Sequence, residues 1–228
     1  MHTRLSWWTQ ESIEWFERAS KMSDYHIRLA DEIEKLLPPC KTVLEFGCGL
    51  GYESEILSKR GYDVTAFDID QNVINRAKAR TGLDIFHACD ANQSDASADA
   101  LLCINYGHIG KIDHLEALLS HAKVRLVYVI SRHNAHGTDT RPDRTEEIKK
   151  LLEENGYRFS MKEISLAFDQ PLRSMDEAES FIEWTYLGKH SQRYMSFIEK
   201  TEDGMYPFVF RNRKENVLFS IETKERKR

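Results

Sequence analysis

The sequence predicts a doubly wound α/β fold on a mostly parallel sheet, and three observations support this prediction. Apolar runs of strand length alternate along the chain with segments of helical periodicity. The first such run, Thr42 to Phe46, ends in a glycine-rich turn that leads directly into a helical segment. The next two, Asp63 to Phe67 and Leu83 to Ala88, each end close to an aspartate. With 228 residues, the chain is long enough for one such domain and too short to need two.

The stretch Val43 to Gly51, VLEFGCGLG, indicates a cofactor site. Its alternate glycines leave no Cβ in the way, so a ligand can approach the main chain at the N-terminus of the following helix. In the dinucleotide fingerprint GxGxxG, the bulky Tyr52 would occupy the place of the third glycine, which weakens the case for NAD. The carboxylate of Glu45 would repel a diphosphate and attract an ammonium or a sulfonium. We therefore expect S-adenosylmethionine, which carries both cations and no phosphate.

Aspartates at the ends of the next two strands favour the same cofactor. Asp68 follows the glycines by about 20 residues, the spacing at which an acid accepts hydrogen bonds from ribose hydroxyls. Asp90 is placed to accept from the adenine amino group, with Ala91 offering its backbone. Acids at the ends of three successive strands form a far more specific combination than the glycine turn alone.

In these motifs the chain resembles the class I, Rossmann-like S-adenosylmethionine-dependent methyltransferases. VLEFGCGLG is similar to their first motif, VTAFDID to their second and FHACDA to their third, and the resemblance covers Lys41 to Ser131. It implies a seven-stranded, mostly parallel sheet with an antiparallel last strand, and methyl transfer that leaves S-adenosylhomocysteine as product. The residues expected to contact the cofactor are Glu45, Gly47, Cys48, Gly49, Asp68, Ile69, Asp90, Ala91 and Asn105.

The other elements follow from apolar periodicity and from helix stop signals. Helices are predicted over Tyr52 to Arg60, Gln71 to Arg80, Asp113 to His121 and Arg144 to Asn155, and strands over Ala98 to Asn105, Val124 to Ile130, within Tyr157 to Phe168, and over Asn216 to Glu222. Residues 40–228 are therefore expected to form the cofactor-binding domain.

Residues 1–39 precede that domain and are predicted to form one or two helices, which Pro38 and Pro39 stop. The segment is rich in aromatic residues. These either pack the helices on the domain or, as the resemblance implies, make the segment a lid over the cofactor and part of the substrate pocket, with Tyr25 as a contact.

A helical insertion at about 172–205 separates the last two strands. It opens with a capping box predicted for Ser174 and Glu177, and its apolar positions favour two amphipathic helices. The insertion either packs on the sheet edge or a second subunit, as in a homodimer, or roofs the substrate pocket with Trp184 and Tyr186. Because a pocket roofed from two sides would admit only a small acceptor, we predict a small-molecule substrate.

The loop after the strand Ala98 to Asn105 is expected to face the reacting methyl group. Methyltransferases that modify amide or exocyclic nitrogens usually carry Asn/Asp-Pro-Pro-aromatic here, whereas this chain continues with Tyr106, Gly107 and His108. This departure argues against methylation of DNA or glutamine. Tyr106 would line the pocket. For a hydroxyl or protonated amine acceptor, His108 is the best-placed base, since histidine titrates near neutral pH; the alternative is an exposed or capping histidine.

A polar loop, SRHNAHGTDTRPD, follows the strand Val124 to Ile130 and contains His133 and His136. Together with His108 and His114, they raise the hypothesis of a metal site. No H-x3-H pattern lies on a predicted helix, so we expect no metal. The loop is instead predicted to bind substrate, with His133 as a contact, because it follows the carboxyl end of a strand.

The composition, 30% charged and 41% hydrophobic, is that of an ordinary soluble protein. The net charge of -5 gives no global attraction to nucleic acid, so a tRNA or DNA substrate is disfavoured. No run is long enough to span a membrane, and the N-terminus MHTRLSWW lacks the apolar core of a signal peptide, so a cytoplasmic protein is expected. The four cysteines form no CxxC pair, and reduced thiols are predicted.

Three other functions stay open. A nicotinamide oxidoreductase requires a turn that tolerates phosphate, which Glu45 and Tyr52 make unfavourable. A methyltransferase that acts on protein or tRNA needs an extended acceptor groove. A non-catalytic S-adenosylmethionine-binding protein is consistent with the same motifs, because residues that bind a cofactor do not prove turnover.

Overall fold

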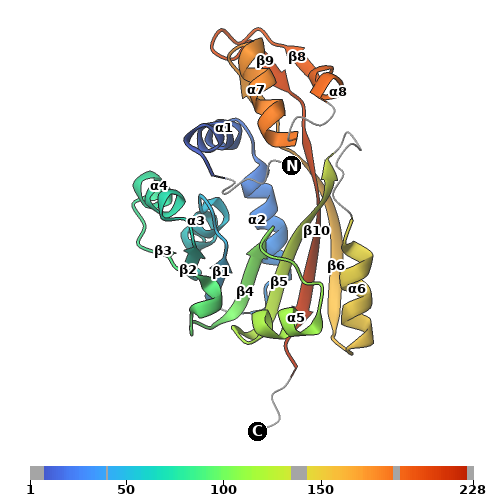
Figure 1. Cartoon of the computed structure of the whole chain (residues 1–228). Coiled ribbons are helices and arrows are strands. Elements are labelled where there is room, and N and C mark those ends of the chain that lie inside the picture. Colours follow the sequence, from blue (N-terminus) through green and yellow to red (C-terminus); the bar gives the residue numbers. More distant parts are fainter. Residues whose placement is uncertain (1–7, 40, 135–142, 187–190, 225–228) are drawn as a thin grey trace. The chain divides into compact units, whose positions relative to one another are not determined.

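Figure 1 shows the fold in a computed structural model of the chain, which describes residues 8–39, 41–134, 143–186 and 191–224. These residues divide into two compact units, each assembled from separate segments. The first unit falls within Met1–His26, His133–Thr140 and Ser165–Lys214, and the second within Ile27–Arg132, Arg141–Ile164 and Glu215–Arg228.

The second unit is built on a seven-stranded sheet (Figure 1) with the strand order β3-β2-β1-β4-β5-β10-β6. The strands are β1 (Thr42–Phe46), β2 (Asp63–Asp68), β3 (Phe86–Ala88), β4 (Ala98–Ile104), β5 (Ala122–Asn134), β6 (Phe159–Ala167) and β10 (Arg213–Glu222). β1 pairs in parallel with β2 and with β4, and parallel pairing continues from β2 to β3 and from β4 to β5.

The last strand runs opposite to its neighbours. The N–H of Glu222, at the end of β10, donates to the carbonyl of Arg158 just before β6, at 2.9 Å. The N–H of Thr223 donates to the carbonyl of Val124, near the start of β5, at 3.0 Å. Because the end of β10 lies beside the starts of both neighbours, β10 is antiparallel to them. The predicted sheet, seven-stranded and mostly parallel with an antiparallel last strand, is confirmed.

The helices that lie mainly in this unit agree with the predicted helices to within two residues at each compared end. They are α2 (Tyr25–Leu36), α3 (Tyr52–Lys59), α4 (Gln71–Thr81), α5 (Ile112–Leu119) and α6 (Thr145–Glu154), with a 3-10 turn η1 (Ala91–Gln93). In α4, the residues at both ends explain why the bounds could be predicted from the sequence. The Asp70 side chain accepts from the N–H of Asn72, and Gly82 ends the helix with a φ of 71°. None of the helices in the described ranges is long and apolar enough to cross a membrane.

Three strands differ by three or more residues at one end from their predicted bounds, and one of them, β10, begins at Arg213 instead of Asn216. β3 begins at Phe86 instead of Leu83, whose N–H donates to Oγ1 of Thr81 at 3.1 Å in the turn that ends α4. β5 continues past Ile130 to Asn134 through polar residues, since ladder hydrogen bonds come from the backbone whatever the side chain. The apolar pattern therefore located each strand without locating both of its ends.

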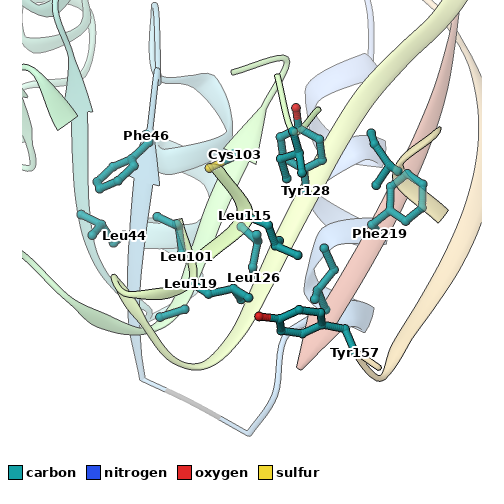
Figure 2. Packing of buried hydrophobic residues seen from close by; sticks show 14 of the residues in the cluster. Leu44, Phe46, Leu101, Cys103, Leu115, Leu119, Leu126, Tyr128, Tyr157 and Phe219 are labelled. Atoms are coloured by element: carbon teal, nitrogen blue, oxygen red, sulfur yellow. The ribbon is translucent and has the colours of Figure 1, made fainter. Parts of the chain in front are cut away.

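The core of the second unit has one buried cluster between the sheet and the helices α5 and α6 and another that includes Ile74 and Ala77 of α4. Figure 2 shows Leu101 of β4 and Leu126 of β5 beside Leu115 of α5, and all three side chains are 0% exposed. Full burial of one leucine is worth about 1.5–3 kcal/mol. This packing holds α5 on the sheet and so restrains the loop that connects β4 to α5.

In its described residues, the first unit contains the helices α1, α7 and α8 and a small antiparallel sheet of order β7-β9-β8. Its elements are α1 (Gln10–Lys21), β7 (Gln170–Leu172), α7 (Met175–Tyr186), α8 (Ser191–Met195), β8 (Ile198–Lys200) and β9 (Phe208–Phe210). Ile182, Tyr194 and Phe210 form its buried core. The helices α7 and α8 agree with the two helices expected in the insertion, whereas the sheet is not predicted, because strands of three residues carry too little periodicity. The predicted domain bounds, 1–39 and 40–228 with an insertion at about 172–205, stay a prediction.

The capping box predicted at the start of α7 forms in part. The N–H of Glu177 donates to Oγ of Ser174 at 3.1 Å, as predicted. The Glu177 carboxylate, however, accepts from the N–H of Arg173 at 2.5 Å, where a complete box would use the N–H of Ser174.

A buried ion pair joins α1 to α7 inside this unit. Nη1 of Arg18 lies 2.9 Å from Oε1 of Glu177 and also donates to the carbonyl of Pro171 at 3.1 Å. The indole N–H of Trp15 donates to the same Glu177 oxygen at 3.3 Å. Because the Arg18 side chain is only 6% exposed, little water screens the pair, and each charge depends on the other.

We expect Arg18→Met to lower the free energy of unfolding by about 2–3 kcal/mol, because the variant leaves the Glu177 carboxylate without its cation in a poorly hydrated place. Urea denaturation followed by tryptophan fluorescence measures this loss, since Trp15 lies beside the pair. Arg211→Met is the control. Arg211 makes two ion pairs but is 53% exposed, so the expected loss is below about 1 kcal/mol. Equal losses in both variants would contradict a special role for Arg18.

Candidate functional site

The carboxyl ends of β1, β2, β3 and β4 lie at one edge of the sheet, because these strands are adjacent and parallel. The chain leaves this edge at the glycine turn after β1, at Asp68, shortly before Asp90, and at Asn105. In open α/β sheets, ligands bind beyond the carboxyl ends of the strands. The fold therefore brings together the four segments that the sequence assigns to the cofactor.

Asp68 organises the glycine turn. Its Oδ2 accepts the N–H of Gly49 at 2.8 Å, and its Oδ1 accepts the N–H of Asp70 at 2.9 Å. The N–H of Cys48 adds a second link between the turn and β2, because it donates to the carbonyl of Phe67 at 2.9 Å. A carboxylate oxygen has two lone pairs. Each oxygen of Asp68 can therefore accept one further hydrogen bond, which is what the two hydroxyls of a ribose require.

Gly47 lies where a side chain would not fit. Its φ is 70°, and a Cβ added to it would lie 2.4 Å from Cδ2 of Tyr106. Any other residue at this position would be both strained and blocked. The Tyr106 ring also packs edge-on against Phe46, with ring centroids 6.0 Å apart. Tyr106, predicted for the substrate pocket, thus lies directly against the turn predicted for the cofactor.

Glu45 is a buried carboxyl group at the end of β1. It is 2% exposed, and the hydroxyl of Ser54, in the first turn of α3, donates to its Oε2. Burial raises the pKa of Glu45 from its ordinary value of 4.5 to about 8; Glu53 adds to the rise, the Ser54 hydrogen bond opposes it, and Asp68 adds to it again. A concentration of carboxyl groups at this place suits a cation and disfavours a phosphate.

Three residues of this region are absent from the predicted contacts. Ser54 is fully buried, Glu53 is 8% exposed, and a Cβ added to Gly51 would lie 2.2 Å from Phe86 of β3. Their positions in the sequence could have indicated them, because Gly51 is the third of the alternate glycines and Glu53 and Ser54 lie in the first turn of the helix that follows. Periodicity does not mark Ser54 and Glu53, because polar residues are ordinarily assigned to the exposed face of a helix.

Cys48 lies inside the turn and is 7% exposed. Burial raises the pKa of its thiol well above the ordinary value, and Glu45 and Asp68 raise it further. The thiol therefore stays protonated near neutral pH, as expected of a small, unreactive residue. Cys48, Cys89 and Cys103 are free thiols, and Cys40 lies outside the described residues.

The part of the edge predicted to hold adenine offers one polar and one apolar group. One oxygen of Asp90 accepts from Nε2 of Gln93 at 3.0 Å, and Ala91 begins η1 beside it with 5% exposure. Ile69 follows Asp68 and is 77% exposed. An exposed apolar side chain beside a hydrogen-bonding group is the combination that a heteroaromatic ring requires.

Asn105 ends β4 with a φ of 52°, the one positive value at a non-glycine residue in the part of the chain that the structure describes. Its N–H donates to the carbonyl of Val129 at 2.8 Å. A residue held in this region costs about 1–3 kcal/mol, and such strain is typical of functional sites. The loop that follows therefore begins from a constrained and defined direction.

His108 lies in that loop, between β4 and α5, with its side chain 36% exposed. Its Nε2 is 3.6 Å from Oε1 of Glu147 on α6. Its carbonyl oxygen lies 3.2 Å from Nδ1 of His114, and the hydroxyl of Tyr128 donates to the carbonyl of Gly107 at 3.4 Å. A partly exposed imidazole beside a carboxylate, on a restrained loop, is suited to accepting a proton.

The other residues predicted for the substrate belong to the first unit. Tyr25 is 6% exposed and packs against Phe168, with ring centroids 4.8 Å apart. Tyr186 stacks on Tyr194, with centroids 3.6 Å apart, and Trp184 is half-buried on the same helix. His133 belongs to β5 by its backbone, and its side chain lies outside what the structure describes. The contact of Tyr25, His133, Trp184 and Tyr186 with a substrate stays a prediction.

Within the described residues, no group of three or more His, Cys, Asp or Glu side chains is placed to hold a metal ion. Of the histidines considered for a metal, His108 and His114 are described in full, His133 only by its backbone, and His136 lies outside the described residues.

The chain matches a family model. The model is described as a methyltransferase domain, and it aligns with residues 15–202, most of the chain. The match covers the glycine turn, the strand-end aspartates and the loop after β4. The sequence-based identification of a methyltransferase and of its cofactor is confirmed at the level of the family.

Curated relatives match a shorter part. A probable S-adenosyl-L-methionine-dependent methyltransferase, TehB, from Haemophilus influenzae (strain 10810) is 39% identical over 75 residues, which is 32% of this chain and 26% of that protein. TehB from a second strain of the same species is 46% identical over 54 residues, 22% of this chain and 18% of that protein. The chain thus spans about a quarter or less of the length of the curated relatives it matches.

Solved structures share the fold over most of the chain. Magnesium protoporphyrin IX methyltransferase from Synechocystis PCC 6803, with bound SAH, has a TM-score of 0.52 at 15% identity and covers 92% of this chain and 86% of its own. A Pyrococcus horikoshii protein described as a proposed RNA methyltransferase has a TM-score of 0.52 at 12% identity, with 89% and 84% covered. At such identities the likeness establishes the fold alone.

The buried carboxyl of Glu45 predicts a pH dependence of stability. Its folded pKa of about 8 lies above the ordinary 4.5, so the folded state holds a proton that the unfolded state releases. The stability of the wild type relative to Glu45→Gln should be highest below about pH 4.5, where both states hold the proton. It should fall as pH rises towards 8, by at most about 1.4 kcal/mol per pH unit.

Urea denaturation of both proteins at several pH values between 5 and 8 measures this difference. Glu146→Gln, at a side chain that is 81% exposed, is the matched control and should show a difference from wild type that hardly changes with pH. A flat difference for Glu45→Gln as well would mean that Glu45 ionises as an ordinary carboxyl group.

Proposed function

Since this chain belongs to the family of methyltransferase domains, we propose that it transfers the methyl group of S-adenosylmethionine to an oxygen or nitrogen of a small-molecule acceptor. The observation that carries this proposal is the convergence of the glycine turn, Asp68, Asp90 and Asn105 at one edge of four adjacent parallel strands. Each of these segments offers a group that matches one part of the cofactor.

Each group of the chain has the chemical character that one part of S-adenosylmethionine requires. Asp68 keeps one lone pair on each oxygen for the ribose hydroxyls, after accepting the N–H groups of Gly49 and Asp70. Gly47 lets the turn lie directly against the Tyr106 ring, and the buried carboxyl group of Glu45 suits an ammonium or sulfonium charge. Ile69 and Asp90 supply the apolar cover and the acceptor for adenine.

The bound cofactor would supply an activated methyl group, so the chain has chiefly to position the acceptor in line with the breaking carbon–sulfur bond. Positioning of this kind can contribute about 7–11 kcal/mol to the barrier reduction. The loop from Asn105 to His108 leaves the same edge as the cofactor segments, with Tyr106 against the turn. His108 is the group of this loop suited to accept the proton of a hydroxyl or a protonated amine, and its Nε2 lies 3.6 Å from Oε1 of Glu147.

Two features support a small acceptor. The net charge of -5 offers a polyanion no long-range attraction. The sequence from Asn105 to His108 departs from the pattern that accompanies methylation of DNA or glutamine. Trp184 and Tyr186, and the aromatic N-terminal segment with Tyr25, are further proposed contacts of the acceptor.

We expect Asp68→Ala to weaken the binding of S-adenosylmethionine by about 2–4 kcal/mol, because two charge-assisted hydrogen bonds to ribose and the anchor of Gly49 are lost together. Isothermal titration calorimetry measures the effect. Asp84→Ala is the control, since Asp84 is 91% exposed and pairs only weakly with Lys78 on the surface. Unchanged affinity in a folded Asp68→Ala protein, or tight binding of NAD by the wild type, would show that the cofactor assignment is wrong.

The transfer itself is tested with S-adenosylmethionine labelled in its methyl group and a small-molecule cell extract, with mass spectrometry of the products. We expect label in a compound of low mass, and a rate at least about 100-fold lower in His108→Gln, since a general base contributes about two to four orders of magnitude. His114→Gln is the control on the neighbouring ring. Label in protein or tRNA would move the assignment to a macromolecular acceptor, and binding without any labelled product would indicate a non-catalytic protein.

A further inference from the structure

Arg80, near the end of α4, reaches back to the turn between β1 and α3. Its Nη2 donates to the carbonyl oxygen of Leu50 at 3.0 Å, and its Nη1 pairs with the carboxylate of Glu55 on α3. Its guanidinium carbon lies 3.9 Å from the centre of the Tyr52 ring. One planar cation therefore makes a hydrogen bond, an ion pair and a cation–π contact, all within six residues of the turn.

The Leu50 carbonyl matters because it belongs to the peptide that closes the turn. The N–H on the other side of that peptide, from Gly51, donates to the carbonyl of Cys48 at 2.8 Å. The peptide plane between Leu50 and Gly51 is thus held from both sides, once by the turn itself and once by Arg80. The glycines of the turn have φ values of 70°, 52° and 69°. A chain with three such residues in five positions has many other conformations available, so an external restraint removes more entropy here than elsewhere.

The contacts of Arg80 also determine whether its positive charge is available to a ligand. Glu55 neutralises the guanidinium and is itself held by Lys59 at 2.6 Å. The Arg80 side chain is 21% exposed and its charge is already paired, so it does not act as a free cation for a phosphate. Its effect on a ligand must therefore pass through the turn.

We propose that Arg80 is a positioning residue of the cofactor site, which holds the Leu50–Gly51 peptide so that the main chain from Gly47 to Gly49 is preformed for S-adenosylmethionine. This inference rests on the proposed function for the identity of the ligand. The restraint lowers the ordering cost that binding would otherwise carry, which is the general effect of preorganisation on affinity. Tyr52, in the place where a dinucleotide site has its third glycine, serves as the platform for the cation.

Two variants of Arg80 and one control test the proposal by calorimetry with S-adenosylmethionine. Arg80→Met, which keeps the stem and removes the fork, should raise the Kd about tenfold. Arg80→Lys keeps a charge for Glu55 but cannot bind Leu50 and cover Tyr52 at the same time, so its Kd should stay within about threefold of that of Arg80→Met. Arg60→Met is the matched control. Arg60 pairs with Asp31 and Glu34 at the C-terminal end of α3, whereas the turn precedes the start of that helix, so the Kd of Arg60→Met should stay within about twofold of wild type.

Amide hydrogen exchange of the ligand-free protein tests whether Arg80 restrains the turn, separately from whether that restraint affects cofactor binding. The Gly51 amide should exchange at least about fivefold faster in Arg80→Met than in wild type, while amides of β4 stay unchanged.

If wild type binds S-adenosylmethionine and both Arg80 variants bind it equally well, the proposal is overturned and the proposed function stands. If Arg80→Lys restores wild-type affinity, charge alone explains the effect, and the positioning role is also overturned. If wild type does not bind S-adenosylmethionine, the proposed function fails, and the exchange rate of Gly51 alone supports or overturns the restraint. Should Arg80→Met not fold, Arg80→Lys carries both measurements.

Discussion

The hydrogen bond from the N–H of Gly49 to the Asp68 carboxylate is the contact on which the candidate site depends. It ties the turn after β1 to the end of β2, and the neighbouring bond from Cys48 to the Phe67 carbonyl fixes the same two segments a second time. Parallel pairing of β1 with β2 places these groups at one edge, so the sheet supplies the geometry and Asp68 completes it. The same carboxylate keeps the capacity to hold a ribose, which couples the shape of the turn to the recognition of a ligand.

Electrostatics beneath the turn add a second constraint. Glu45 is buried at the end of β1, near Glu53 and Asp68, and its high pKa records the cost of ionising it there. Ionisation of this carboxyl group is costly without a cation nearby. It becomes favourable when a cation binds beside it, because the attraction between the two charges acts in a medium of low polarity. Buried carboxyl groups suit a positively charged ligand group better than a diphosphate, and this distinction separates the proposed cofactor from NAD.

The fold of the second unit was predictable because its signals are local. Apolar runs, the capping aspartate Asp70 and the glycine Gly82 mark the elements within a few residues of where they occur. The small sheet β7-β9-β8 gave no such signal. Its pairing joins residues such as Leu172 and Phe208, which are far apart in the chain, in strands of three residues each. Pairing of this kind depends on packing around the α7 and α8 core, which a single sequence does not reveal.

By itself, the sequence determined the strand–turn–helix around the alternate glycines, the acids at the ends of successive strands, and so the class of cofactor, because each rests on the backbone and charge of adjacent residues. Only the tertiary structure decided which distant side chains lie against these segments. Tyr106 lies against Gly47, Arg80 binds the carbonyl of Leu50, and Glu147 lies beside His108, each pair joining different elements of the fold. These contacts are set by how helices pack on the sheet, and the free energy of that packing is shared among many residues, so no local pattern in the chain specifies them.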